Sequence, residues 1–328
     1  YLNGIFDALV AQNKSQRFSA ILETSRGCPF HCAFCDWTQL HSKVRRASLK
    51  RVEQEIIWMS IHKIDYIWGA DANFGIFEDD ITIVEWLVRE KNKTGFPEIL
   101  NMNYAKNNFD SVFQINKMLN DAGMCRGVPL SFQSLLPTVL RNIGRENMPL
   151  TNFTKLLAKY KEAGIPAYSE LILGLPGETY ESFCRGMGIL LEAGQHNTIN
   201  VYNYELLCNS SMGSPESVAK FKIETIKIPL VRFHCALSET YITELSNIVV
   251  STYSMSREMW RQTSLFSVIV QCFHNLGLLQ CYAIYLFYEK GVKYETFYQR
   301  LQKWIEANRD SVCGRIYTKL NSCYDDVL

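Results

Sequence analysis

Residues 23–37 read ETSRGCPFHCAFCDW and carry the densest chemical signal in the chain. Three cysteines, Cys28, Cys32 and Cys35, follow an apolar run at the spacing CxxxCxxC. A loop this short can wrap three thiolates around one inorganic cluster, while its backbone N–H groups donate to the sulfides. Three ligands on a four-iron cluster leave one iron open to a small molecule. A zinc site, with His31 as a further ligand, and a set of unrelated buried thiols are the alternatives.

Short apolar runs alternate with longer helical patterns from residue 18 to about residue 205. This alternation is typical of a parallel sheet with crossover helices and predicts six strand–helix units. The strands are expected at residues 18–24, 66–69, 99–103, 128–133, 167–173 and 198–206. The helices are expected near residues 48–61, 79–91, 109–122, 136–143, 151–163 and 180–193. Periodicity alone does not separate an open doubly wound sheet from a partial barrel, and both place chemistry at the carboxyl ends of the strands.

Several residues mark expected helix boundaries. Ser48 and Thr151 are predicted N-caps, and Gly123 and Gly164 are predicted helix stops. After about Gly213 the pattern changes to long helical stretches rich in Tyr, Phe and Leu. We expect this part to be a separate, mostly helical segment packed on the sheet.

The composition limits the class of protein. The chain has 328 residues, 47% hydrophobic and 20% charged residues and a formal charge of +1, which excludes disorder and gives no sign of nucleic-acid or membrane binding. The most apolar region, residues 266–288, is interrupted by polar side chains and predicts buried helices. The chain begins at Tyr1 with no signal peptide, so we expect a cytoplasmic protein, or a fragment of one. The cysteines outside the loop show no ligand spacing and are interpreted as buried thiols: Cys125, Cys184, Cys208, Cys235, Cys272, Cys281, Cys313 and Cys323.

The cysteine loop resembles the cluster loop of radical S-adenosylmethionine (radical SAM) enzymes, which has an aromatic residue before the last cysteine. Phe34 is that aromatic residue, and the resemblance places it among the cofactor-binding residues. The resemblance covers roughly residues 1–260, because later motifs follow in the expected order. More narrowly, the chain is similar to the radical SAM part of proteins with an N-terminal cobalamin-binding domain, and its opening YLNGIFD resembles their linker.

The resemblance implies an α/β architecture, a partial (β/α)6 barrel of the TIM type with a C-terminal helical segment. The expected domains are a linker at residues 1–17, the radical SAM partial barrel at 18–212 and the helical segment at 213–328. It also implies a [4Fe–4S] cluster held by Cys28, Cys32 and Cys35, whose open iron binds S-adenosylmethionine. One-electron reduction then gives methionine and a 5′-deoxyadenosyl radical, so the radical chemistry belongs to the cofactor.

The second expected strand ends in WGADANFG, where Asp71 and Asn73 can accept hydrogen bonds from an ammonium group. A glycine at a strand end, Gly69, lets a ligand approach the backbone. The resemblance places the segment that contacts the methionine amino group here, with Gly69-Ala70-Asp71 replacing the commoner Gly-Gly-Glu. An ordinary turn is the alternative.

The fourth expected strand ends in LSFQS, and Ser131 and Gln133 share one face of it. The resemblance implies ribose and carboxylate contacts from this strand, and Arg145 matches an arginine position of the family. A solvated charge at a helix end is the alternative for Arg145.

The fifth expected strand runs into GLPGE, which matches the family's adenine-contacting motif. Glu170 is a carboxylate on an otherwise apolar strand, so it is expected to face the cavity, or else to pair with a lysine. Glu178 is expected to close the turn and Thr179 to cap the next helix. On the sixth strand, Tyr202 is expected to contact adenine or substrate, with aromatic core packing as the alternative.

The leading prediction is therefore a radical SAM enzyme that forms part of a cobalamin-dependent methyltransferase acting on an unreactive carbon. Cobalamin would enter through a domain absent from this chain, in which no DxHxxG motif occurs. The alternatives are cobalamin-independent radical chemistry (rearrangement, oxidation or methylthiolation) and a non-catalytic iron–sulfur or zinc-binding module. Expected partners are a small-molecule or biosynthetic-intermediate substrate and a reductant such as flavodoxin or ferredoxin. The basic stretch from Lys43 to Arg51 is read as a solvated helix start, or as a contact for an anionic substrate or the redox partner.

Overall fold

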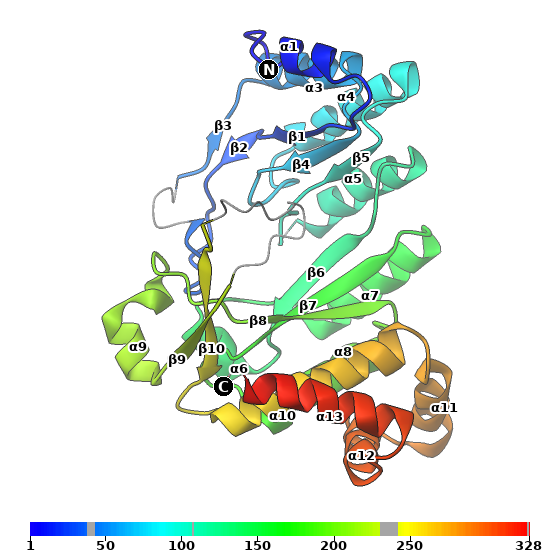
Figure 1. Ribbon diagram of the computed structural model, residues 1–328. Helices are drawn as coiled ribbons and strands as arrows, with labels where there is room; N and C mark the ends of the chain where they lie inside the picture. The colour runs from blue at the N-terminus through cyan, green and yellow to red at the C-terminus, as the bar shows by residue number, and fades with distance from the viewer. Residues whose placement is uncertain (38–42, 107, 230–241, 327) are drawn as a thin grey trace. The chain divides into compact units, whose positions relative to one another are not determined.

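The computed structural model (Figure 1) describes residues 1–37, 43–106, 108–229, 242–326 and 328. These residues divide into two compact units, which are described separately. The first unit comprises Tyr1–His31, Trp37–Leu130 and Met148–Tyr168. The second unit comprises Cys32–Asp36, Ser131–Asn147 and Ser169–Leu328.

The first unit is built on a parallel three-stranded sheet in the order β1-β4-β5. Strand β1 (Ser19–Leu22) pairs with β4 (Tyr66–Gly69), which pairs with β5 (Ile99–Asn101). The helices of this unit are α1 (Asp7–Gln12), α3 (Leu49–Ile61), α4 (Asp79–Thr94), α5 (Phe109–Asp121) and α7 (Leu150–Glu162). Helical spacing places Val52, Ile56 and Met59 on one buried face of α3, where they join the core with apolar residues of the sheet.

A second three-stranded sheet has the order β6-β7-β8. Its strands are β6 (Val128–Gln133), β7 (Ala167–Leu173) and β8 (Thr198–Asn203). Buried and half-buried residues alternate along β6 and β7, as the side-chain period of two requires. All six predicted strands are therefore confirmed, and three of them have the predicted bounds.

The second unit adds helices to this sheet. They are α6 (Pro137–Asn142), α8 (Tyr180–Glu192), α9 (Pro215–Phe221), α10 (Arg257–Val270), α11 (Gln280–Lys290), α12 (Tyr294–Ala307) and α13 (Val312–Asp325). A 3₁₀ turn (Ser211–Gly213) precedes α9, and a π-helical turn (Gln271–Asn275) follows α10. Helix α10 contacts α8, α12 and α13 (Figure 1).

The C-terminal segment is not helical throughout, contrary to the reading of its sequence. Strands β9 (Glu224–Pro229) and β10 (Leu245–Ser251) form an antiparallel pair. The alternation of Ile226 and Ile228 with polar residues, and the β-branched run in β10, favour strands over helices. These strands were missed because the longer helical patterns around them dominate the segment.

Two of the three predicted N-caps are confirmed by the helix starts. The side chain of Ser48 accepts from Arg51 N, and Thr179 forms a capping box with Ser182, so both predicted caps are confirmed. The prediction for Thr151 is wrong, because α7 already begins at Leu150, directly after Pro149. Its N-terminus receives no side-chain cap in the described chain. Proline fixes its own φ and restricts the residue before it, which sets this boundary without a cap.

Gly123 and Gly164 both have φ +67° and follow α5 and α7. A left-handed residue at this position ends a helix, so both predicted stops are confirmed.

A helix needs about 20 mostly apolar residues to span a bilayer. Among the described residues no single helix is long and apolar enough to cross a membrane, whereas the pair Arg257–Asn275 and Gln280–Lys290, bent by 92°, is long and apolar enough when its two parts are taken together.

The interpretation of the scattered cysteines as buried thiols is only partly correct. Cys184 is buried, whereas Cys208, Cys281 and Cys323 are exposed. Cys235 lies outside the described residues. Cys281 and Cys323 lie on exposed positions of α11 and α13, where apolar neighbours in the sequence do not imply burial.

Candidate functional site

The cysteine loop leaves the first sheet through a short antiparallel ribbon. Strand β2 (Ser25–Arg26) pairs with β3 (Arg45–Arg46), with Ser25 opposite Arg46 and Arg26 opposite Arg45. The ribbon therefore joins the two ends of the segment that carries all three cysteines. Gly27, at φ +103°, makes the turn between the ribbon and Cys28.

Asp71 anchors the start of this ribbon. Its carboxylate is buried and accepts from Thr24 N at 2.7 Å, from Thr24 Oγ1 at 2.6 Å and from Ser25 Oγ at 2.6 Å. Hydrogen bonds to an ionised carboxylate are stronger than neutral ones. Asp71 thus has a structural role in positioning the loop, and its predicted contact with a cofactor stays a prediction.

Asn73 contacts one of the loop cysteines directly. Its Nδ2 donates to Cys28 Sγ at 3.1 Å, and both side chains are buried. The other polar atom of this side chain, Oδ1, is buried without a hydrogen-bond partner among the described residues. Asn73 can therefore bind the sulfur and still offer an acceptor to a ligand.

Gly69 is required for a reason other than ligand approach. A Cβ at this position would lie 1.5 Å from Met102 Sδ. The side chain of Met102 is itself buried and belongs to the core of the first unit. The glycine at this strand end is therefore explained by packing between neighbouring strands.

The second part of the loop is held by the core of the second unit. Ala33 N donates to Ile143 O at 2.8 Å, and Met212 N donates to Ala33 O at 2.9 Å. Phe34 is half-buried and packs against the apolar cluster that contains Ile143 and Met212. In the structure this aromatic residue anchors the loop, and its predicted contact with a cofactor stays a prediction.

Arg145 lies beside Cys32. Its Nη2 donates to Ser131 O, and its Nε donates to Asn147 Oδ1 at 3.1 Å. Burial lowers the pKa of Arg145, and the neighbouring Cys32 and Glu170 partly oppose that shift. Nη1 is buried with no hydrogen-bond partner among the described residues, so the guanidinium has a donor that could bind a ligand.

The predicted residues of β6, β7 and β8 meet in one network. Ser131 Oγ donates to Glu170 Oε2, and the Tyr202 hydroxyl lies near Glu170 and Asn200. Burial raises the pKa of Tyr202, and the Glu170 carboxylate adds to the shift. Glu170 therefore faces hydroxyl groups and Arg145, while the alternative of a lysine partner finds no support in this network.

Two further predicted residues lie at the end of β6 and in the turn after β7. Gln133 has φ +66°, a left-handed conformation that is uncommon outside glycine. Glu178 is buried and accepts from Ser134 Oγ and Ser182 Oγ, both at 2.5 Å. Burial raises the pKa of Glu178. These contacts confirm that Glu178 closes the turn, whereas the role of Gln133 stays a prediction.

The predicted site residues fall in both units. Cys28, Asp71 and Asn73 belong to the first unit, and Cys32, Cys35 and the network around Glu170 to the second. Among the described residues, no three His, Cys, Asp or Glu side chains lie together so that they could hold a metal ion. Ligation of one cluster by the three thiols stays a prediction.

Comparison with known proteins gives whole-chain similarity to two methyltransferases. The 2-(S-pantetheinyl)-carbapenam-3-carboxylate methyltransferase of Streptantibioticus cattleyicolor is 38% identical over 331 residues, which cover 100% of this chain and 48% of the relative. The cobalamin-dependent radical SAM methyltransferase TokK of Streptomyces tokunonensis is 36% identical, with the same two shares. The chain thus spans about half the length of these curated relatives.

A solved structure shares the fold. The radical S-adenosylmethionine methyltransferase TsrM of Kitasatospora setae, with tryptophan substrate and a SAM analog bound, superposes with a TM-score of 0.50 at 19% identity, covering 62% of this chain and 39% of TsrM. This likeness confirms the expected α/β fold of the radical SAM kind. Residues 22–185, which include the cysteine loop, Ser131, Arg145 and Glu170, match the Radical SAM superfamily. The chain belongs to the radical SAM superfamily.

Proposed function

We propose that this chain is the radical SAM part of a cobalamin-dependent methyltransferase acting on an unreactive carbon of a small molecule. The observation that carries the proposal is the similarity of the whole chain to two methyltransferases, one of them named as cobalamin-dependent. The arrangement of donors around the cysteine loop supports it.

The loop has the features that a cluster site requires. Cys28 and Cys32 are buried thiols; Asn73 Nδ2 donates to Cys28 Sγ, and the guanidinium of Arg145 lies near Cys32. Groups that donate to ligating sulfurs orient the ligands and tune the metal centre. We assign Cys28, Cys32 and Cys35 as the ligands of a [4Fe–4S] cluster.

Two buried, unpartnered atoms fit S-adenosylmethionine. Asn73 Oδ1 is an acceptor suited to an ammonium group, and Arg145 Nη1 is a donor suited to a carboxylate. Buried polar groups normally have hydrogen-bond partners, so we expect a ligand to supply the missing partner of each of these atoms. In the second unit, Glu170, Ser131 and Tyr202 offer acceptors and donors for ribose hydroxyls. When bound, the cluster supplies the electron that cleaves S-adenosylmethionine, and the residues of this chain bind and orient that molecule.

The proposals of cobalamin as a cofactor and of a small-molecule substrate rest on the names of similar proteins. TokK is named for its dependence on cobalamin, and the TsrM structure holds tryptophan. We therefore propose a small-molecule substrate, a reductant such as flavodoxin or ferredoxin, and cobalamin bound outside the residues assigned here.

The test is formation of 5′-deoxyadenosine by the cluster-loaded protein. The chain is reconstituted without oxygen from iron and sulfide, reduced chemically, and assayed for cleavage of S-adenosylmethionine beside Cys32→Ala. Cys208→Ala is the matched control, because it removes an exposed thiol outside the loop. We expect product from the parent and from the control and none from Cys32→Ala. Methyl transfer is then assayed by adding methylcobalamin to the cluster-loaded protein.

Two results would contradict the proposal. Equal product from Cys32→Ala and from the parent would remove the cluster assignment. A loaded four-iron cluster that yields no 5′-deoxyadenosine would indicate a non-catalytic iron–sulfur module.

A further inference from the structure

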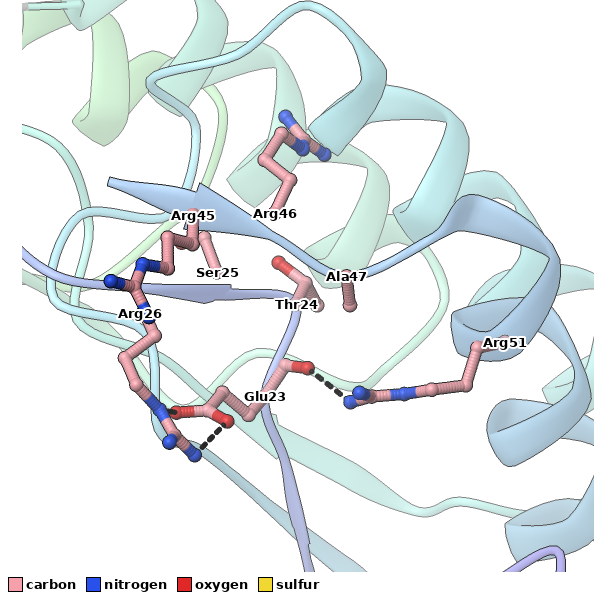
Figure 2. A pocket seen from close by; sticks show the side chains of 8 residues that line it. All are labelled: Glu23, Thr24, Ser25, Arg26, Arg45, Arg46, Ala47 and Arg51. Atoms are coloured by element: carbon pink, nitrogen blue, oxygen red, sulfur yellow. Dashed lines mark hydrogen bonds and ion pairs between the residues drawn. The ribbon is translucent and has the colours of Figure 1, made fainter. Parts of the chain in front are cut away.

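A pocket of about 240 Å³ opens beside the β2–β3 ribbon of the first unit. Figure 2 shows its lining, in which the side chains of Arg26 and Arg51 approach Glu23 from opposite sides. The lining residues are Glu23, Thr24, Ser25, Arg26, Arg45, Arg46, Ala47 and Arg51. Four arginines and one glutamate are among the lining residues, although the whole chain has 34 basic and 33 acidic residues. The pocket is therefore a local concentration of positive charge.

The ribbon places two of these arginines directly opposite each other. Arg26 and Arg45 are register partners in the antiparallel pair. Like charges at such positions destabilise a sheet. The Glu23 carboxylate offsets the charge of Arg26 through contacts of 2.6 and 2.7 Å. Among the described residues no carboxylate forms an ion pair with Arg45, so an incoming anion would relieve this repulsion.

The other two arginines are only partly satisfied. Arg46 pairs with Asp80 at 3.0 Å, but its Nη1 is buried without a partner among the residues described. Arg51 donates to Glu23 O at 3.1 Å, and its Nε lies 3.3 Å from Glu55. Since an arginine carries five N–H donors, the contacts of the exposed Arg51 leave donors for a carboxylate, whereas Arg46 is held by Asp80 and by the Phe77 ring.

The pocket is open at its rim. The side chains of Arg26 and Arg51 are 63% and 46% exposed. Enclosed sites for small organic ligands bury most of the ligand and typically have volumes of about 300 Å³ or more. A shallow rim of exposed arginines suits carboxylates presented on the surface of another protein.

The position of the pocket indicates what that protein does. Arg26 is separated from Cys28 by Gly27 alone, so their Cα atoms lie no more than about 7.6 Å apart. A protein bound at the arginines would therefore stand next to a cluster ligand. Cleavage of S-adenosylmethionine needs one electron delivered to that cluster from outside the chain.

We propose that this pocket, through the exposed Arg26, Arg45 and Arg51, docks the acidic surface of a flavodoxin-type electron donor. The proposal rests on the proposed function, because it assumes a cluster at Cys28. One electron passes from the reduced flavin of the donor to the cluster, and no bond between heavy atoms forms or breaks. Complementary charges of this kind steer association and make it sensitive to salt.

The test measures binding separately from catalysis. Oxidised flavodoxin is the probe, and its association with the cluster-loaded protein is followed by biolayer interferometry at low and high salt. We expect Arg45→Glu to slow association by on the order of tenfold and to flatten the salt dependence. Arg45→Lys should retain most of the binding. Arg300→Glu, at an exposed position in α12, changes the net charge equally and should bind as the parent does.

An assay of 5′-deoxyadenosine formation with two reductants then distinguishes an effect on docking from an effect on the reaction itself. With flavodoxin as reductant, Arg45→Glu should form 5′-deoxyadenosine more slowly than the parent, whereas with titanium(III) citrate the two rates should match. If neither reductant gives product with any variant, the proposed function fails, and the binding data alone decide the docking site. Arg45→Gln and Arg26→Gln repeat the binding test with milder changes.

Two outcomes would overturn the docking site. One is flavodoxin binding by Arg45→Glu that matches the parent at low salt. The other is tight binding of inorganic phosphate that Arg45→Glu abolishes while flavodoxin binding is unchanged, which would assign the pocket to a phosphorylated small molecule.

Discussion

Asn73 Nδ2 donates a hydrogen bond to Cys28 Sγ at 3.1 Å across 45 residues of sequence. Both side chains are buried, so bulk water does not compete for this contact. Hydrogen bonds to ligating sulfurs are one determinant of the reduction potential of an iron–sulfur cluster. Asn73 is thereby a candidate for tuning the cluster in addition to contacting S-adenosylmethionine.

The first prediction removes this donor. In Asn73→Leu the sulfur of Cys28 keeps more negative charge, which disfavours the reduced cluster, so we expect a lower reduction potential. Spectroelectrochemical titration of the loaded protein measures it. Asn103→Leu is the matched control, because this exposed residue near the end of β5 donates to Asp71 O at 3.4 Å and not to a cysteine. An unchanged potential in Asn73→Leu would contradict the tuning role.

The second prediction concerns the three hydrogen bonds that Asp71 accepts. In Asp71→Asn one carboxylate oxygen becomes an N–H₂ group, which cannot accept from Thr24 or Ser25. We expect the free energy of unfolding to fall by about 1–3 kcal/mol, because a buried donor loses its acceptor. Urea denaturation of the iron-free protein measures this change without involving the cluster. Asp110→Asn, at a 97% exposed carboxylate, should leave the stability within about 0.5 kcal/mol of the parent.

The third prediction tests why residue 69 is a glycine. The Cβ of Gly69→Ala would overlap Met102 Sδ, so the core must shift at a cost of about 1–3 kcal/mol. Met102→Ala removes the clash and leaves a cavity of its own. The double variant should therefore be more stable than the sum of the two single effects predicts, which thermal unfolding of all four proteins measures. Strict additivity would show that the two side chains do not meet.

Patterns within one segment predicted much of this molecule. The side-chain period of two placed Ser131 and Gln133 on one face of β6. The carboxylate of Glu170 on an otherwise apolar strand predicted a ligand or a lysine partner, and the structure shows a hydrogen bond from Ser131 Oγ. Cap chemistry likewise located the starts of α3 and α8 at Ser48 and Thr179. In each case the cause lies within a few residues of the effect.

Relationships between distant segments could not be predicted in the same way. Nothing local in the sequence pairs Asn73 with Cys28, or sets Arg26 opposite Arg45. The sequence suggested ligand approach at Gly69, because it does not show that Met102, one helix and one strand further along the chain, packs against this glycine. Strands β9 and β10 were missed because a strand is stabilised by its partner, which the sequence does not name.

A buried histidine gives the chain an acid-sensitive point away from the cysteine loop. His274, in the π-helical turn after α10, is fully buried. Its Nδ1 lies 2.8 Å from the Tyr298 hydroxyl, and its Nε2 lies 3.1 Å from His196 Nδ1. The Tyr294 ring packs edge-on against it. Burial lowers the pKa of His274 to about 4, and the charge of His196 adds to the shift.

The last prediction is a loss of stability between pH 6.5 and pH 4. In this window the unfolded chain protonates His274 whereas the folded chain keeps it neutral, so the unfolded state binds more protons and the free energy of unfolding falls as the pH falls. The contribution of His274 approaches about 1.4 kcal/mol per pH unit and totals about 3 kcal/mol. Urea denaturation across this range should show a shallower pH dependence in His274→Gln than in the parent. Tyr298→Phe breaks the same hydrogen bond but keeps the histidine, so it should be less stable at every pH with the slope of the parent. Equal slopes in His274→Gln and the parent would mean that the folded protein protonates His274 as readily as the unfolded chain does.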